Sequence, residues 1–190
     1  MGMQTMTRLR VIAGTAKGRR LNLVPGDITR PITDRVKESL FNILRADLPG
    51  SVFLDLFAGT GSVGIEALSR GAKMVRFVDK NKPAIDTIRE NIRLTHFEER
   101  CEVLQIDAYH MLARNPDMQF DYVYIAPPQY NDIWKQALLK IDAAPNWMVD
   151  DGWAIVQIHP KEYESVDLVN LSEFDQRKYG NTLLVFYERV

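Results

Sequence analysis

The chain has 190 residues, of which 46% are hydrophobic, so it can bury one core but is too short for two domains of ordinary size. Its single cysteine, Cys101, excludes an internal disulfide. A run of about 18 apolar residues and a signal-peptide segment are both lacking, which argues against membrane-spanning and secreted classes. We therefore expect a single-domain, soluble, cytoplasmic protein.

The net charge of −1 hides a separation of charge along the chain. Residues 1–50 hold nine Lys and Arg residues against four acids, and the remainder holds 15 against 21. A basic N-terminal segment suits a polyanion such as nucleic acid, although an ordinary solvated surface is an equally good reading of charge alone. Three scattered histidines and one cysteine give no metal-ligand spacing, so we expect no metal site.

The first elements form an N-terminal extension over residues 1–50. Short β-prone runs on either side of residues 14–18 predict a hairpin. Thr33 is a candidate N-cap for a helix that carries Val36, Leu40, Ile43 and Leu44 on one face.

The rest of the chain alternates between strand-like and helix-like patterns. Apolar, β-branched runs recur at residues 52–56, 74–78, 102–106, 121–126, 153–158 and 183–187. Helical periods follow the first two runs, and Pro83 lies in the first turn of the second helix. This alternation predicts an α/β domain with a mostly parallel sheet.

A glycine-rich loop follows the first strand. Gly59, Gly61 and Gly64 have the G-x-G-x-x-G spacing of a cofactor loop, in which the backbone approaches a ligand at a helix N-terminus. The spacing alone is weak, since structural turns also use glycine. Asp79 ends the second strand, 20 residues after Gly59, where a carboxylate can bind ribose hydroxyls. The pattern predicts an adenosine-containing cofactor, either NAD or S-adenosylmethionine.

Three features favour S-adenosylmethionine. Asp55, within the first strand, can bind the methionine ammonium, whereas it would repel a pyrophosphate. Asp107-Ala108 ends the third strand, near the expected adenine position, and Pro127-Pro128 ends the fourth, beside the expected methyl group. A helix-capping Asp107 and a salt-bridged Asp55 are the structural alternatives, and two prolines can simply end a strand.

These residues occur in segments that resemble one family over nearly the whole chain. The sequence is similar to the bacterial 16S rRNA guanine-N2 methyltransferases of the RsmD type in five segments, namely RVIAGTAKGRRL, RPITDRVKESLFNIL, FLDLFAGTGSVGIEALSRGA, VDKN and YGNTLLVFYE. The second of these is the most specific, because glycine loops are common to all class I methyltransferases.

The resemblance implies a fold, a reaction and a set of site residues. The fold is the Rossmann-like class I methyltransferase fold: a mostly parallel seven-stranded sheet with its last strand antiparallel and helices on both faces, preceded by a small hairpin and helix. The reaction is methyl transfer from S-adenosylmethionine to N2 of a guanine in 16S rRNA, within a small-subunit particle or assembly intermediate. The implied cofactor residues are Arg30, Thr33, Asp55, Phe57, Gly59, Gly61, Asp79, Asp107 and Ala108. The implied RNA contacts are Arg8, Arg10, Lys17, Arg19 and Arg20.

The chain departs from the family at the catalytic loop. Such enzymes carry Asp or Asn, two prolines and an aromatic residue, because the conjugated amino group attacks well only when acceptors hold its N–H bonds. Here Ala126 replaces the acceptor, and Gln129 replaces the aromatic residue. We expect Ala126, Pro127, Pro128, Gln129 and Tyr130 to form the catalytic loop, in which the Pro127 carbonyl, the Gln129 amide and the Tyr130 ring compensate.

Four functions remain open. The leading one is rRNA guanine-N2 methylation. The second is a catalytically impaired RNA-binding or ribosome-assembly factor that retains the cofactor pocket, since Ala126 lacks an acceptor. An NAD-dependent oxidoreductase explains the glycine spacing but neither Asp55 nor the prolines. Methylation of adenine N6 in DNA explains the prolines but not the N-terminal segment.

Overall fold

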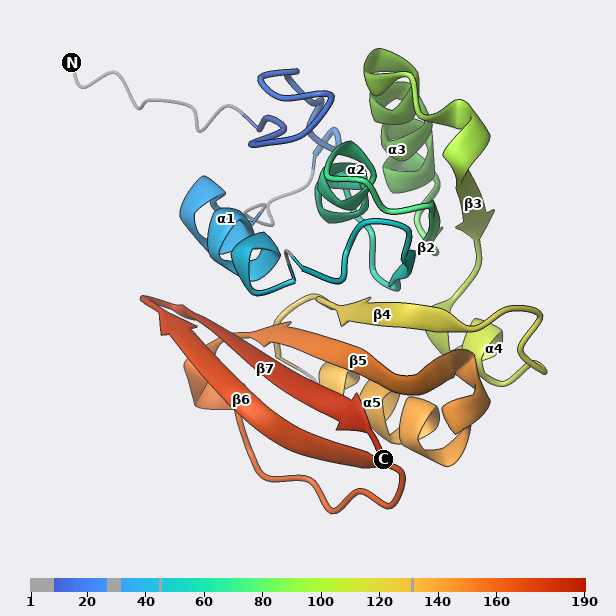
Figure 1. Ribbon diagram of the computed structural model, residues 1–190, viewed down its shortest axis with the longest axis vertical. Coiled ribbons are helices and arrows are strands. Elements are labelled where there is room, and N and C mark those ends of the chain that lie inside the picture. Colours follow the sequence, from blue (N-terminus) through green and yellow to red (C-terminus); the bar gives the residue numbers. More distant parts are fainter. Residues whose placement is uncertain (1–8, 27–31, 45, 131) are drawn as a thin grey trace.

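The computed structural model describes residues 9–26, 32–44, 46–130 and 132–190, and its centre is one seven-stranded sheet with the order β3-β2-β1-β4-β5-β7-β6 (Figure 1). The strands are β1 (Val52–Asp55), β2 (Met74–Asp79), β3 (Cys101–Gln105), β4 (Phe120–Ile125), β5 (Met148–Ile158), β6 (Leu171–Tyr179) and β7 (Thr182–Arg189). The α-helices are α1 (Asp34–Ile43), α2 (Ser62–Ser69), α3 (Lys82–Thr95), α4 (Ala108–Leu112) and α5 (Ile133–Ala143), and short 3₁₀ turns cover Glu98–Arg100, Pro145–Trp147 and Pro160–Glu162.

The strand directions agree with the class I methyltransferase sheet that the resemblance implies. The first five strands pair in parallel, and β7 is antiparallel to both β5 and β6. Each of the six expected runs matches a strand, and three of them extend one residue past the end of that strand, at Leu56, Ile106 and Ala126. The seventh strand, β6, was not predicted from an apolar run, because this edge strand exposes polar side chains over most of its length.

Helices cover the sheet on both sides and create two hydrophobic cores (Figure 1). On one side α1, α2, α3 and residues 9–21 pack on the sheet around Phe53, Phe77 and Tyr124, and we call this the first core. On the other side α4 and α5 pack around Leu54, Val123 and Val156. The two cores take alternate residues of the same strands, as expected for strands covered on both faces.

The expected N-terminal helix and hairpin are both recognisable. Thr33 caps α1, since its Oγ1 accepts a hydrogen bond from the Val36 N–H. Within the described residues the hairpin is a single antiparallel bridge that joins Arg10 to Arg20. Buried Leu9, Val11 and Leu21 anchor this segment in the first core.

The packing of α2 against β2 requires a glycine. A Cβ on Gly64 would lie 2.3 Å from an atom of the Phe77 ring, so any side chain would force the helix away from the sheet. The third glycine of the loop is therefore explained by helix–strand contact. Among the described residues, no helix is long and apolar enough to cross a membrane.

Candidate functional site

Five of the predicted cofactor residues, namely Asp55, Phe57, Gly59, Gly61 and Asp79, lie at the carboxyl ends of the central parallel strands β1 and β2. Asp55 ends β1, Asp79 ends β2, and the loop from Phe57 to Gly61 leads into α2. Gly61 is the N-cap of α2 with a φ of 75°, and Gly59 has a φ of 53°. A Cβ on Gly59 would meet nothing within 4 Å, so the loop backbone is open to a ligand at this point.

Asp79 is held against the glycine loop by backbone hydrogen bonds. Its Oδ2 accepts from the Gly59 N–H at 3.0 Å, and its Oδ1 accepts from the Asn81 N–H at 2.9 Å. Each carboxylate oxygen has further acceptor capacity. The side chain is therefore fixed in place and can still accept hydrogen bonds from two ribose hydroxyls.

Asp55 is a buried carboxyl with a single hydrogen bond in the structure. Asp55 is 2% exposed, and its Oδ2 accepts a hydrogen bond from the Gly64 N–H at 3.1 Å. Burial raises the pKa of Asp55 to about 7, and the nearby charge of Asp79 acts in the same direction, while the Gly64 hydrogen bond opposes it. No described basic side chain forms an ion pair with Asp55. The site can therefore take a cationic partner.

Asp107 caps helix α4, which was the structural alternative to a role in adenine binding. Its Oδ1 accepts from the Tyr109 N–H at 2.9 Å and the His110 N–H at 3.4 Å, which starts α4. Ala108 is buried against the second core. The cap accounts for Asp107 without a ligand, and it uses only Oδ1 of the carboxylate. A role of Asp107 at the edge of an adenine stays a prediction.

The Pro-Pro loop turns its two polar candidates outward. Ala126 and Pro127 are half-buried, whereas Pro128, Gln129 and Tyr130 are exposed. Tyr130 is 61% exposed with a φ of 64°, and its N–H donates to Glu162 Oε1 at 2.7 Å. In this arrangement neither the Gln129 amide nor the Tyr130 ring is packed at the end of β4.

A polar pair that sequence reasoning missed lies beneath this loop. The Tyr124 hydroxyl donates to Gln157 Oε1 at 2.5 Å, between neighbouring strands β4 and β5. The available signal was a glutamine inside the otherwise apolar run WAIVQI, whose strand ends beside the prolines.

The predicted RNA-contact residues lie in the segment that covers α2. Arg10, Lys17, Arg19 and Arg20 are all exposed, and Arg10 Nε donates to Asp34 Oδ2 at 2.9 Å. Thr33 is exposed at the start of α1, and its side chain bonds to the helix backbone at Val36 and to no described residue of the glycine loop. Arg8 and Arg30 lie outside the described residues.

A buried ionic network, which sequence reasoning also missed, fixes this segment. Lys37 of α1 and Glu66 of α2 are 0% exposed, with Lys37 Nζ 3.6 Å from Glu66 Oε2. Glu66 also accepts from the Ile12 and Ala13 N–H groups at 2.8 and 2.9 Å and from Arg70 Nε at 2.7 Å. The network joins the basic segment to two helices.

Asn91 of α3 connects the same segment to the glycine loop. Its Oδ1 accepts from the Asn22 N–H at 2.7 Å, and its Nδ2 donates to the Asn22 carbonyl at 3.1 Å and the Thr60 carbonyl at 2.9 Å. The end of the basic segment and the cofactor loop therefore share one buried amide.

The residues fit S-adenosylmethionine better than a dinucleotide. The buried carboxyl of Asp55 suits an ammonium group, the fixed carboxylate of Asp79 suits a ribose, and the open face at Gly59 leaves room for a ligand. A pyrophosphate near Asp55 would meet a like charge. No group of three or more His, Cys, Asp or Glu side chains in the described parts of the chain could hold a metal ion.

Strand order, helix layers and glycine loop together define a class I methyltransferase fold. Residues 9–188 match the family described as Conserved hypothetical protein 95, and the chain belongs to this family, which is that of ribosomal RNA small subunit methyltransferase D.

Individual relatives agree with this assignment. The chain is 36% identical over 184 residues to YlbH of Bacillus subtilis, whose name describes a candidate rRNA methyltransferase, with 95% of this chain and 99% of that protein covered. It is 38% identical over 143 residues to ribosomal RNA small subunit methyltransferase D of Haemophilus influenzae, with 74% and 73% covered. A solved structure of an Escherichia coli protein described as a candidate methyltransferase, yhhF, superposes with a TM-score of 0.85 at 26% identity and covers 96% of this chain and 98% of that one.

Proposed function

We propose that the protein transfers a methyl group from S-adenosylmethionine to the exocyclic N2 amino group of a guanine in small-subunit rRNA. The observation that carries the proposal is the convergence of Asp55, Asp79 and the Pro127-Pro128 loop at one sheet edge, in a chain that belongs to the methyltransferase D family. The described residues form one methyltransferase domain in this proposal, with residues 1–50 as its basic extension.

The residues of the chain have distinct tasks in this function. Asp55 binds the methionine ammonium, and Asp79 binds the ribose hydroxyls while it holds the glycine loop through Gly59. When bound, S-adenosylmethionine supplies the electrophilic methyl group. The Pro127 carbonyl, at the end of β4, accepts a hydrogen bond from the target amino group and orients its nitrogen.

RNA binding is assigned to the basic segment. Exposed Lys17, Arg19 and Arg20 offer positive charge to phosphates, while the buried contacts of Glu66 keep the segment in one conformation. Phosphate contacts of this kind position a substrate without reading its sequence. The choice of guanine then depends on the residues around Pro127.

The test is a methyl-transfer assay with labelled S-adenosylmethionine and small ribosomal subunits, or their rRNA, from cells that lack this methyltransferase. We expect one labelled nucleotide, which nuclease digestion identifies as N2-methylguanosine. Label in N6-methyladenosine would refute the guanine specificity, and no label in either naked rRNA or particles would refute the methyltransferase function.

A second candidate is a non-catalytic RNA-binding factor that retains the cofactor pocket. It is favoured by Ala126, which offers no side-chain acceptor, and by the exposure of Gln129 and Tyr130. This candidate expects S-adenosylmethionine binding by calorimetry with no turnover on particles or rRNA. Turnover by the unmodified protein would reject it.

A further inference from the structure

The Tyr124–Gln157 pair lies where the missing acceptor should be. In the register of β4 with β5, Tyr124 pairs with Ile155 and Ile125 pairs with Val156. Continuing this register by one residue places Ala126 beside Gln157. The pair and the alanine therefore lie at the same end of neighbouring strands.

All three side chains are on the same side of the sheet. Tyr124 and Ile155 belong to the first core, and Ala126 packs against it. Because side chains alternate along a strand, Gln157 lies on the same face as Ile155, and it is only half-buried. Its amide is thus at the carboxyl edge, on the Asp55 side of the sheet, since Asp55 pairs in register with Tyr124.

The hydrogen bond to Tyr124 fixes which way the glutamine faces. Tyr124 is 2% exposed, and burial raises its pKa well above its ordinary value, so the hydroxyl stays protonated and donates. An amide oxygen has two acceptor positions, of which Tyr124 occupies one. Among the described residues no second donor contacts this oxygen, and Ala126, its neighbour by register, has only a methyl group.

On this basis, and resting on the proposed function, we propose that Gln157 Oε1 accepts a hydrogen bond from the target amino group in place of the acid missing at position 126. Tyr124 acts as a positioning residue that holds the amide. With the Pro127 carbonyl, Gln157 then provides the second of the two acceptors that an exocyclic amine requires. The neutral amide replaces a carboxylate, so this acceptor does not titrate.

Gln129 is the competing candidate. Gln129 lies in the Pro-Pro loop, but it is exposed, and the N–H of its neighbour Tyr130 donates to Glu162 in the 3₁₀ turn that follows β5. Gln157 is instead built into a strand and held by a buried hydroxyl. Rigid elements position reacting groups better than loops do.

The first experiment compares matched substitutions in single-turnover methyl transfer to the rRNA substrate. Gln157→Leu should lower the rate constant roughly 100-fold, as loss of one preorganised hydrogen-bonding group does elsewhere. Tyr124→Phe, which keeps the ring, should lower it about tenfold because only the orientation of the amide is lost. Gln136→Leu, the same change at an exposed site on α5, is the control and should leave the rate unchanged.

Cofactor affinity by calorimetry and the KM for RNA should stay within about twofold of the unmodified protein in all three variants, since the lost bond acts on the reacting nitrogen. If Gln157→Leu retains the full rate while Gln129→Leu loses it, Gln129 is the acceptor and our inference is wrong. Equal losses in cofactor affinity and rate would also overturn it, because they would indicate general damage.

The pH dependence of the methyl-transfer rate distinguishes an acceptor role of Gln157 from a purely structural role, which would not change it. In Gln157→Glu the new carboxyl is a stronger acceptor when ionised than when protonated, so the rate should rise with pH through its pKa and approach that of the unmodified protein. A profile identical to that of the unmodified protein would contradict the assignment. Turnover by the unmodified protein is measured first, and its absence would count against the proposed function. If the unmodified protein is active and Gln157→Leu is equally active, only the inference about Gln157 is wrong.

Discussion

Asp55 is the residue whose ionisation should control cofactor binding. Burial raises its pKa from 3.8 to about 7, so near neutral pH a fraction of the free protein carries a neutral carboxyl. An ammonium group binds the carboxylate, and binding below pH 7 must therefore release a proton. We expect the dissociation constant for S-adenosylmethionine to be about tenfold higher at pH 6 than at pH 8, measured by calorimetry in buffers of different ionisation enthalpy.

The matched variant is Asp55→Asn, which has nearly the same shape and does not titrate. Its affinity should be lower at pH 8 and nearly constant between pH 6 and 8. The stability of the unmodified protein should depend on pH in the opposite sense to its cofactor affinity: the raised pKa of Asp55 means that the folded state holds a proton the unfolded chain has lost, so its stability falls as pH rises from about 4 to 7. Relative to the variant, the unmodified protein should lose at most about 4 kcal/mol over this range in urea unfolding. Parallel pH curves for the two proteins would contradict the pKa assignment.

At the scale of elements, the basic segment and helices α1 and α2 are joined through Lys37 and Glu66. Glu66 has four partners, whereas Lys37 has Glu66 and the Arg10 carbonyl, to which its Nζ donates at 2.6 Å. Burial lowers the pKa of Lys37, and the charge of Glu66 opposes that effect. Removing the acid leaves a buried cation without its counter-charge.

We expect Glu66→Gln to lower the free energy of unfolding by about 3–5 kcal/mol, and Lys37→Met by less, because Glu66 keeps Arg70 and two N–H groups. Adding Lys37→Met to Glu66→Gln should restore part of the loss. Urea unfolding of the four proteins at pH 7 measures this coupling. Strictly additive losses would indicate that the two groups do not stabilise each other.

How much the sequence predicts depends on whether a feature is local. The N-cap at Thr33 and the acids at the ends of β1 and β2 were predictable because each depends on its immediate neighbours. The Tyr124–Gln157 bond joins residues 33 positions apart, and its existence depends on strand register. The exposed position of Tyr130 could not be predicted from the sequence either, because it depends on a hydrogen bond to Glu162, which is 32 residues further along the chain.

Edge position explains the missed strand. β6 pairs only with β7, so its sequence LSEFDQRKY is mostly exposed and lacks the apolar run of a covered strand. The family resemblance supplied the seventh strand where periodicity did not. Periodicity measures burial, and it finds strands only when they are buried.

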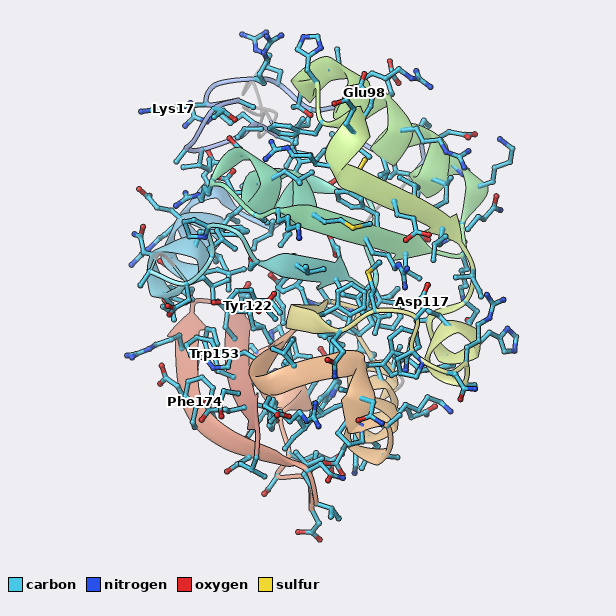
Figure 2. All side chains as sticks on the ribbon, turned by 45° about the vertical axis from the view of Figure 1, so that its right-hand side comes forward. Lys17, Glu98, Asp117, Tyr122, Trp153 and Phe174 are labelled. Carbon is cyan, nitrogen blue, oxygen red and sulfur yellow. The ribbon has the colours of Figure 1, made fainter. Side chains whose placement is uncertain are left out.

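At the scale of the whole molecule, a basic surface segment and an acidic hollow lie in different places. Exposed Arg10, Lys17, Arg19 and Arg20 lie on the segment that covers α2, whereas a hollow of about 310 Å³ at the amino ends of β4 and β5 is lined by five acids. They are Asp47, Asp121, Asp150, Asp151 and Glu188. Figure 2 labels Lys17 near the upper end of the view, and Tyr122 and Trp153, which also line the hollow, in its lower half. An RNA phosphate backbone is attracted to the first region and repelled by the second.

This separation makes the salt dependence of RNA binding a test of which face is used. Removing two phosphate contacts should reduce the slope of log affinity against log salt by about 1.4–1.8, because each contact releases condensed counterions. We expect this reduction of the slope for the double variant that carries Lys17→Gln and Arg19→Gln, with affinity for rRNA measured by fluorescence anisotropy between about 50 and 200 mM salt. The control removes the same charge with Lys140→Gln and Arg114→Gln, two exposed positions in α5 and just after α4, and these helices pack on the opposite face of the sheet from the basic segment. Because net charge changes equally in both pairs, a general electrostatic effect would flatten both slopes alike, whereas binding through the basic segment flattens only the first.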